Sequence, residues 1–208
     1  MGSVWAIVVA AGSGSRFGAP KQFEPLGGRR VLDWSLDAAR TVSDGVVVVL
    51  PPASVPAGEP AADAVTGGGD TRSASVRAGL ALVPEEADVV VVHDGARPLA
   101  GPDLFAAVVA AVRAGADAAV PGVAPADTLR WRTGGVADRD GLVAVQTPQA
   151  FRAAALRAAH VGEPEATDDA SLVEAAGGKV VVVDGSPDNL KITNPSDLAV
   201  AEALLHAR

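Results

Sequence analysis

Apolar positions in this chain form short runs that alternate with stretches of helical periodicity. The strand-like runs are rich in β-branched residues and end at glycine, proline or polar residues. They are Trp5–Val9, Val46–Leu50, Val89–Val92, Ala118–Val120, Leu142–Val145 and Val180–Val183. The helix-like stretches that separate most of them are Val31–Arg40, Thr71–Leu82, Asp103–Arg113, Phe151–Ala159 and Asp168–Ala176. This alternation predicts an α/β fold whose sheet is covered by helices on both faces.

Two further segments are assigned from their local chemistry. Asn194 and Pro195 are typical of the N-cap and the first position of a helix, and the pattern carries that helix to His206. Segment 51–66 is rich in proline and alanine without clear periodicity, so it is predicted to be a surface loop.

Nearly all polar motifs of the chain directly follow a predicted strand. In open α/β sheets, ligands bind at the carboxyl ends of the strands. The first such motif, residues 10–21, has glycines that allow positive φ and a close approach of the backbone to a ligand. Successive backbone N–H groups in such a turn form a concave anion site, and Arg16 and Lys21 add two positive charges beside it. The loop therefore indicates a polyphosphate site.

Two familiar phosphate loops do not match this segment. A Walker loop needs Gly-Lys followed directly by Ser or Thr, whereas Lys21 stands between Pro20 and Gln22. A dinucleotide fingerprint needs an acidic residue at the end of the second strand, but here that strand runs into two prolines at 51–52. The loop thus favours another class of nucleotide-binding site.

The composition narrows the class of protein further. At 208 residues with 49% hydrophobic content, the chain is expected to form one globular domain with a substantial core. The formal charge of −8 argues against nucleic acid as a partner. No apolar run reaches membrane-spanning length and no signal peptide is recognised, so no membrane association is expected. The chain has no cysteine, and a cytoplasmic location is expected.

The glycine loop resembles a known signature. The pattern A-A-G-x-G-x-R at positions 10–16, followed by P-K-Q at 20–22, is similar to that of sugar-nucleotide-type nucleotidylyltransferases. More narrowly, it resembles the 2-C-methyl-D-erythritol 4-phosphate cytidylyltransferase family of isoprenoid biosynthesis, and four further stretches extend the likeness over nearly the whole chain. The resemblance implies a Rossmann-like nucleotidyltransferase sheet with a protruding β-hairpin arm. It implies that the nucleotide-binding residues of the loop are Ala10, Ala11, Gly12 and Gly14 and that Arg16 and Lys21 are catalytic.

A triple glycine at 67–69 precedes the second helix. From the residues alone, Asp70 or Thr71 caps that helix, or the glycines let backbone groups read a base edge. The resembling family has a G-G-x-x-R-x-x-S element that contacts cytosine and ribose. That likeness implies that Gly69, Asp70 and Ser75 bind the nucleotide.

Asp94 and Arg97 directly follow the strand at Val89–Val92. A carboxylate at this sheet edge suits Mg²⁺, which favours one or two carboxylates plus substrate phosphates. The alternative is a surface Asp94–Arg97 pair worth under about 1 kcal/mol. The family's V-H-D-x-A-R-P element implies that Asp94 lies near the metal and Arg97 near the methylerythritol phosphate. His93 has no second ligand nearby in sequence and is predicted to be structural.

Residues 123–141 interrupt the α/β pattern. Thr128–Arg132 is β-like, two glycines at 134–135 offer a tight turn, and an isolated hairpin is marginal in water unless it packs on something. Trp131 in this segment would be an unusual exposed aromatic unless a partner covers it. We therefore predict an arm that clasps a second subunit. The resembling family is homodimeric with such an arm, which implies that Arg139 binds substrate phosphate in the neighbouring subunit and that Thr128 lines the same pocket.

Three further residues are assigned by resemblance. Thr147 ends a strand and Thr167 stands just before a helix, and both have structural explanations of their own. The family elements T-P-Q-x-F and T-D-[DE]-A-S imply that both also contact substrate. Lys191, one of three lysines in the chain, would ordinarily be solvated, but the element N-[IL]-K-[IV]-T implies that it is a second catalytic lysine.

The resemblance implies transfer of a cytidylyl group from CTP to 2-C-methyl-D-erythritol 4-phosphate, with release of pyrophosphate and Mg²⁺ as cofactor. Residues 1–208 would form a single nucleotidyltransferase domain with 123–141 as its dimerisation arm. The alternatives are ribitol 5-phosphate as acceptor, a non-catalytic CTP-binding regulator, and a nicotinamide-dependent dehydrogenase. No Ser-His-Asp arrangement or paired-carboxylate site stands out in the sequence, and a phosphate monoester is already an anionic nucleophile near neutral pH. Positioning and cationic stabilisation are therefore expected to dominate the chemistry.

Overall fold

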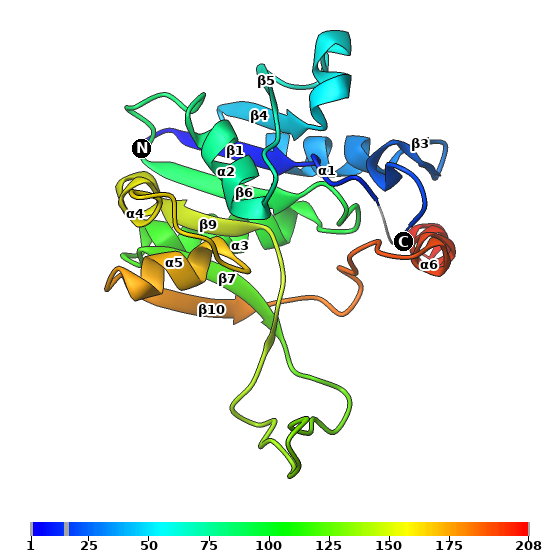
Figure 1. The fold of residues 1–208 in the computed structure, drawn as a ribbon, viewed down its shortest axis with the longest axis vertical. Coiled ribbons are helices and arrows are strands. Elements are labelled where there is room, and N and C mark those ends of the chain that lie inside the picture. The colour runs from blue at the N-terminus through cyan, green and yellow to red at the C-terminus, as the bar shows by residue number, and fades with distance from the viewer. Residues whose placement is uncertain (1, 15–16, 208) are drawn as a thin grey trace.

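A central mixed sheet organises the protein (Figure 1). The computed structural model describes residues 2–14 and 17–207. Within these residues, eight strands form the sheet in the order β10-β7-β9-β6-β1-β4-β5, with β8 paired to β7. The strands are β1 (Val4–Val9), β4 (Gly45–Leu50), β5 (Ala64–Gly67), β6 (Val89–Asp94), β7 (Ala118–Val123), β8 (Ala144–Val145), β9 (Gln149–Arg152) and β10 (Val180–Asp184). A separate two-stranded ribbon consists of β2 (Pro25–Leu26) and β3 (Arg29–Arg30).

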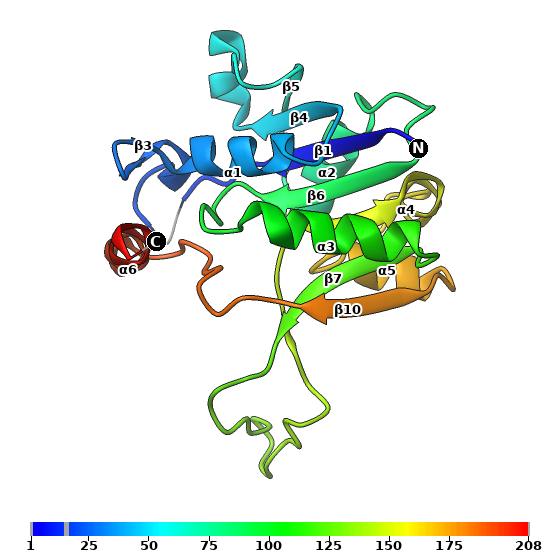
Figure 2. The ribbon, with the colours of Figure 1, turned by 180° about the vertical axis from the view of Figure 1, so that it is seen from behind.

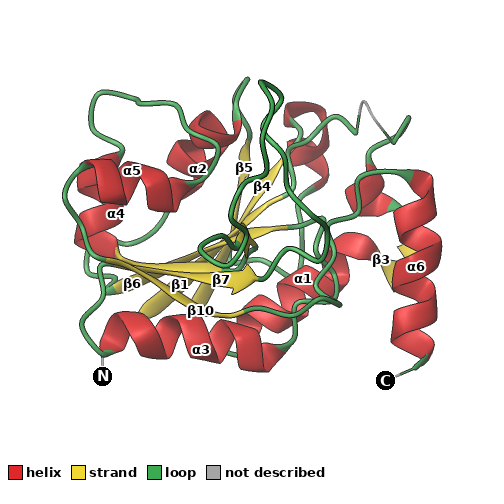
Figure 3. Ribbon diagram, turned by 90° about the horizontal axis from the view of Figure 1, so that it is seen from below, coloured by secondary structure: helices red, strands yellow, loops and turns green. Residues whose placement is uncertain are grey.

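Helices cover both faces of the sheet, as the sequence predicts (Figures 2 and 3). One face carries α1 (Val31–Arg40) and α3 (Pro102–Arg113), and the other carries α2 (Arg72–Leu80), α4 (Ala153–Ala159) and α5 (Asp169–Ala175). Alternate residues of each strand feed two separate cores, because successive side chains point to opposite faces. Val8 of β1 packs with Leu36 and Phe105, while its neighbour Ile7 packs with Val76 and Leu156.

The antiparallel strand β9 was not predicted. It pairs with β6 and β7, and α4 begins only at Ala153, so the predicted helix start at Phe151 is wrong. Phe151 is instead a buried strand residue between two neighbouring strands. Because β9 runs against β6, its first residues lie at the edge where the parallel strands end. Residues 146–148 are thereby brought to the site edge.

Two other boundaries differ from the predictions. Segment 51–66 contains the 3₁₀ turn η2 (Pro52–Ala57) and runs into the edge strand β5, so the loop prediction is wrong in part. All four residues of β5 are half-buried, which explains why its apolar signal is weak. The predicted strand Leu142–Val145 is reduced to β8, two exposed residues.

The segment between β7 and β8 protrudes from the sheet as an arm (Figure 1). Its tip turns at the predicted glycines, where Trp131 N–H donates to Gly135 O at 3.2 Å and Ala137 N–H donates to Leu129 O at 2.9 Å. Trp131 is 64% exposed. The arm therefore presents an aromatic side chain that the described residues leave largely uncovered.

The C-terminal helix α6 (Pro195–His206) begins and ends as predicted and returns the chain to the N-terminal region (Figure 2). Ala201 packs with Leu26 and Val31, and Glu202 accepts a hydrogen bond from Gly27 N–H at 2.9 Å. Ile192 N–H donates to Ala96 O at 2.8 Å just before the helix. These contacts place the segment before α6 beside the end of β6. No helix among residues 2–14 and 17–207 combines the length and apolar character needed to cross a bilayer.

Candidate functional site

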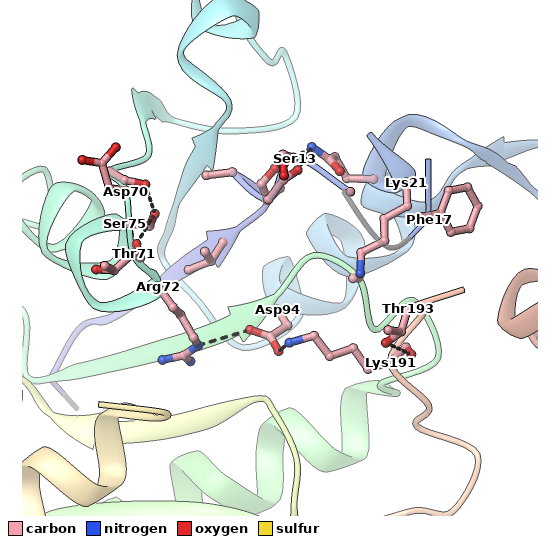
Figure 4. Close-up of a pocket in the computed structure, with 18 residues that line it drawn as sticks. Ser13, Phe17, Lys21, Asp70, Thr71, Arg72, Ser75, Asp94, Lys191 and Thr193 are labelled. Carbon is pink, nitrogen blue, oxygen red and sulfur yellow. Dashed lines mark hydrogen bonds and ion pairs between the residues drawn. The ribbon is translucent and has the colours of Figure 1, made fainter. Parts of the chain in front are cut away.

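A cavity of about 450 Å³ opens at the carboxyl ends of β1 and β6 (Figure 4). Its walls come from the loop after β1, the start of α2, the end of β6 and the segment before α6. Ten of the residues singled out in the sequence line it. They are Ala10, Ala11, Gly12, Gly14, Lys21, Gly69, Asp70, Ser75, Asp94 and Lys191. Arg16 lies outside the residues that the structure describes.

The glycine loop has the close turn that its sequence predicts. Gly14 has φ +70°, and a Cβ there would lie 1.8 Å from Ala19 O, so only glycine fits. Gln22, which is buried, donates through Nε2 to Ala10 O at 2.8 Å and to Gly12 O at 3.2 Å. These bonds tie the 3₁₀ turn η1 (Lys21–Phe23) to the loop. Lys21 is thereby held at the cavity wall, and its side chain points into the cavity (Figure 4).

The glycine-rich segment before α2 lies directly against the end of β1. A Cβ at Gly68 would lie 2.2 Å from the Cβ of Ala11, so a larger residue would force the two segments apart. Thr71 is the N-cap, since its Oγ1 accepts from Ala74 N–H at 3.0 Å. Ser75 Oγ donates to Thr71 O at 2.9 Å. The capping explanation therefore holds for Thr71, while Gly69 and Asp70 remain on the cavity wall.

Three cations surround the carboxylate of Asp94 (Figure 4 shows two of them). Lys191 Nζ lies 2.7 Å from Oδ2, Arg72 Nε lies 3.6 Å from Oδ1, and Arg97 Nε lies 4.0 Å from Oδ2. Burial alone would raise the pKa of Asp94, but Lys191, Arg72 and Arg97 outweigh it and hold the pKa well below its usual range. Asp94 is therefore a charged carboxylate at neutral pH.

Arg72 is a site residue that the sequence reasoning did not single out. Its Nη1 donates to Asp169 Oδ2 at 2.6 Å, and the other oxygen of Asp169 accepts from His160 Nε2 at 3.0 Å. Burial would lower the pKa of Arg72, but Asp169 and Asp94 raise it above its usual value. The available signal was its position, because a cation in the first turn of a helix opposes the helix dipole and needs a compensating anion.

A second cavity of about 340 Å³ adjoins the first. Arg97, Thr147 and Thr167 line it, as expected for residues assigned to one substrate. Both cavities share Arg72, Asp94 and Lys191. The charge cluster thus stands at the junction between a larger and a smaller compartment.

Thr147 is held by hydrogen bonds within the protein. Its Oγ1 accepts from Asp94 N–H at 3.0 Å and lies 3.0 Å from His93 Nδ1. Burial lowers the pKa of His93 to about 4, so the ring is neutral at pH 7. His93 Nε2 faces Arg97 O at 3.3 Å, and a carbonyl can only accept, so Nε2 carries the proton and Thr147 donates to Nδ1. His93 is structural, as predicted.

The arm residues lie away from both cavities of this chain. Thr128 and Arg139 are exposed, and neither lines either cavity. Arg139 Nη1 donates to Ala126 O at 2.8 Å, within the arm itself.

The described residues contain no group of three or more His, Asp or Glu side chains that could enclose a metal ion. Asp94 is instead a single, partly accessible carboxylate at the junction of the cavities. One carboxylate plus substrate phosphates is a donor set that Mg²⁺ accepts. The residues present therefore fit a metal that is held jointly by protein and substrate.

Comparisons with known proteins indicate the same family over nearly the whole chain. A family model described as IspD, 2-C-methyl-D-erythritol 4-phosphate cytidylyltransferase, matches residues 4–207. A Cereibacter sphaeroides protein of that name is 44% identical, over 96% of this chain and 96% of its own length. The bifunctional enzyme IspD/IspF of Dinoroseobacter shibae is also 44% identical over 99% of this chain, which spans 54% of that longer protein. The crystal structure of 2-C-methyl-D-erythritol 4-phosphate cytidylyltransferase from Thermus thermophilus has 40% identity and a TM-score of 0.85, covering 99% of this chain and 100% of that one.

Proposed function

Because this chain belongs to the 2-C-methyl-D-erythritol 4-phosphate cytidylyltransferase family, we infer that it transfers the cytidylyl group of CTP to 2-C-methyl-D-erythritol 4-phosphate in isoprenoid precursor biosynthesis. The observation that carries this function is the junction of two cavities at one charge cluster. Lys21 and Lys191 come from opposite ends of the chain and line the same cavity as Asp94. Such a junction brings two phosphorylated molecules together against their mutual repulsion.

The reaction needs no dedicated base. A phosphate oxygen of the acceptor attacks the α-phosphorus of CTP, the bond from that phosphorus to the bridging oxygen breaks, and pyrophosphate leaves. Charge accumulates on the α-phosphate oxygens during transfer, and preorganised cations stabilise it. Lys21 and Lys191 are the described residues placed for this role, and we assign Arg16 to it by family likeness. Positioning is the second contribution to catalysis, because the fixed cations hold both reactants in reacting geometry.

The larger cavity suits CTP. Its wall combines the glycine loop, whose residues Ala10 to Gly14 suit the triphosphate, with Gly69, Asp70 and Ser75, which suit the cytosine and ribose. The smaller cavity suits the acceptor, with Arg97, Thr147 and Thr167 on its wall. In this assignment the guanidinium of Arg97 pairs with the acceptor phosphate. Thr147 contributes by holding the Asp94 backbone, since its hydroxyl proton is donated to His93.

The protein functions as a homodimer in this proposal, joined through arm 123–141. Support comes from Trp131 and Val136, which are 64% and 59% exposed on a segment that protrudes from the sheet (Figure 1). A partner's sheet would bury them. Thr128 and Arg139 of each arm would then complete the acceptor pocket of the other subunit, which is why they lie outside the cavities of a single chain.

Mg²⁺ is the proposed cofactor, with Asp94 as its protein ligand. Asp94 would hold the ion together with substrate phosphates, and the chemistry supplied there would be neutralisation of phosphate charge. The Asp94 carboxylate is already paired with Lys191 and faces Arg72 and Arg97. These cations disfavour a metal ion alone and favour one that arrives with the triphosphate. The formal charge of −8 supports the proposal that nucleic acid is not a partner. The family assignment supports the proposal of a cytoplasmic enzyme in which residues 1–208 form one nucleotidyltransferase domain.

A matrix of nucleotides and acceptors, scored for pyrophosphate release, tests the function. CTP with 2-C-methyl-D-erythritol 4-phosphate should give the highest kcat/KM, above CTP with ribitol 5-phosphate and above UTP or ATP with either acceptor. A higher value with ribitol 5-phosphate would reassign the acceptor. Binding of CTP without pyrophosphate release from any acceptor would instead indicate a regulator.

A further inference from the structure

Two buried amide side chains, Gln146 and Asn189, pair at the smaller cavity, where Gln146 is part of the wall and Asn189 lies outside the lining. Asn189 is fully buried and Gln146 is 9% exposed. Asn189 Nδ2 donates to Gln146 Oε1 at 3.2 Å and to Thr147 O at 2.9 Å. Gln146 Nε2 donates to Ser186 O at 2.8 Å, and its Oε1 accepts from Ser186 N–H at 3.2 Å. The pair thus joins the segment before β9 to the segment after β10.

A third segment is tied to the same pair. The backbone carbonyl of Asn189 accepts from Arg97 Nη1 at 2.7 Å, so the guanidinium that lines the acceptor cavity is anchored on the Asn189 peptide. The loop of Arg97 follows β6, whereas Asn189 follows β10. Residues that are distant in sequence therefore meet at Asn189, whose own side-chain hydrogen bonds are buried and shielded from water.

Lys191 depends on this point for its position. Residues 185–194 lie between β10 and α6 and include no helix or strand, so specific hydrogen bonds must hold them. Two residues before Lys191, Asn189 is held by the hydrogen bonds described above. Directly after Lys191, Ile192 is buried, and its N–H donates to Ala96 O at 2.8 Å. The Lys191 side chain itself is 40% exposed, so its own packing fixes it weakly.

We propose that Asn189 and Gln146 are positioning residues for the transfer reaction. Their pairing sets the Lys191 ammonium at the junction of the two cavities. The same anchor holds the Arg97 guanidinium in the acceptor cavity. Asn189 lines neither cavity and Gln146 lines only the smaller one, so Asn189 acts through the residues it holds and Gln146 through its bond to Asn189. The inference rests on the proposed function, because the role of Lys191 belongs to it.

The alternative is a purely structural pair that supports the fold. A double-mutant cycle with Lys191 separates the two, because an effect that passes through Lys191 disappears once Lys191 is gone. Asn189→Asp keeps the side-chain shape but removes the donor and turns a carboxylate toward two carbonyl oxygens. A matched control exists on the same segment. Asn194→Asp makes the identical change at the exposed N-cap of α6, where aspartate caps equally well.

The assay is pyrophosphate release with CTP and 2-C-methyl-D-erythritol 4-phosphate, with the number of CTP-binding sites measured for each variant. We expect Asn189→Asp to lower kcat at least about tenfold per binding site, with little change in KM for CTP, whose proposed contacts lie on other segments. With the acceptor saturating, a loss that passes through Arg97 appears in the KM for the acceptor, so in the Lys191→Ala background the same change should alter kcat less than about twofold. Asn194→Asp should match the wild type.

Equal falls in both backgrounds, or an unchanged kcat for Asn189→Asp, would overturn the inference and leave the proposed function standing. If Asn189→Asp does not fold, Asn189→Ala enters the same cycle, since it removes the donor without burying a charge. A wild-type chain that releases no pyrophosphate would instead remove the proposed function itself.

Discussion

The Nζ atom of Lys191 lies 2.7 Å from Oδ2 of Asp94, across 97 residues of sequence. The pair stands at the junction of both cavities, where the phosphates of two substrates would meet. Before substrate binds, the Lys191 ammonium and the Asp94 carboxylate form an ion pair with each other. When phosphates enter, they compete with Asp94 for the ammonium, which is already in place. Little rearrangement is then needed at the moment of reaction, and preorganisation of this kind is what makes electrostatic catalysis effective.

Lys21→Ala and Lys191→Ala should each lower kcat by at least about a hundredfold, because each removes a cation that stabilises the developing charge. Steady-state pyrophosphate release measures the effect. Lys179→Ala is the matched control, since Lys179 is exposed and lines neither cavity. Near-wild-type turnover in either site variant would exclude that lysine from the catalytic group.

Asp94→Asn should raise the Mg²⁺ concentration needed for half-maximal activity and lower kcat by at least about tenfold. The substitution removes the proposed metal ligand and leaves Lys191 without its partner. A Mg²⁺ titration at saturating CTP measures both changes. Asp188→Asn serves as the control, because Asp188 is exposed and lines neither cavity. An unchanged Mg²⁺ dependence in Asp94→Asn would contradict the metal assignment.

Trp131→Asp should convert the proposed dimer to monomers, because it places a charge on the exposed aromatic side chain of the arm. Sedimentation velocity measures the state of assembly. Val161→Asp makes a comparable change at a residue that is 79% exposed outside the arm, and it should leave the dimer intact. The arm would lose its proposed role if both variants sedimented alike.

Mixed dimers test whether Arg139 acts in the neighbouring subunit. Arg139→Ala and Lys191→Ala homodimers should both be nearly inactive. After subunit exchange, half of the dimers are mixed and each has one intact site, so about a quarter of wild-type activity should return. If Arg139 served its own chain, no combination would rebuild a complete site and activity would stay low.

The stability of the protein should fall as the pH drops from about 6.5 to about 4. Burial lowers the folded pKa of His93 to about 4, so in this window the unfolded chain binds the proton and the folded chain does not. The shift corresponds to about 3 kcal/mol of unfolding free energy. Urea unfolding across the window measures it, and His93→Gln should flatten the curve by that amount. His206→Gln, at the exposed end of α6, should not, and equal slopes in all three proteins would contradict the prediction.

Local patterns predicted those parts of the fold that local chemistry determines. The β1 run, α1 and the Asn194-Pro195 start of α6 have strong periodic or capping signals, and the structure has them where expected. Strand β9 has four residues and contains Ala150, which favours helices as readily as strands. Its identity comes from the hydrogen bonds it makes between β6 and β7. Such pairing is tertiary information that no short window contains.

The residues of the site likewise fall into those that the sequence identifies and those that only the fold reveals. Residues that line the cavities lie in glycine-rich or polar motifs, so Lys21 and Asp94 could be selected from the residues themselves and Lys191 from its family resemblance. Arg72 and Asn189 were not selected, because their roles depend on partners that the fold brings from 97 and 43 residues away, Asp169 and Gln146. Supporting contacts of this kind leave no spacing pattern in the chain.

The return of the chain from β10 to the N-terminal ribbon has a consequence for biosynthesis. When the first 150 residues of a nascent polypeptide have left the ribosome, the segments of β1, β6 and the glycine loop are available to fold. Lys191, just before α6, has not yet been added. Turnover must therefore await synthesis of the segment at 189–192 and its docking beside the end of β6. A growing chain could hold nucleotide before it could consume it.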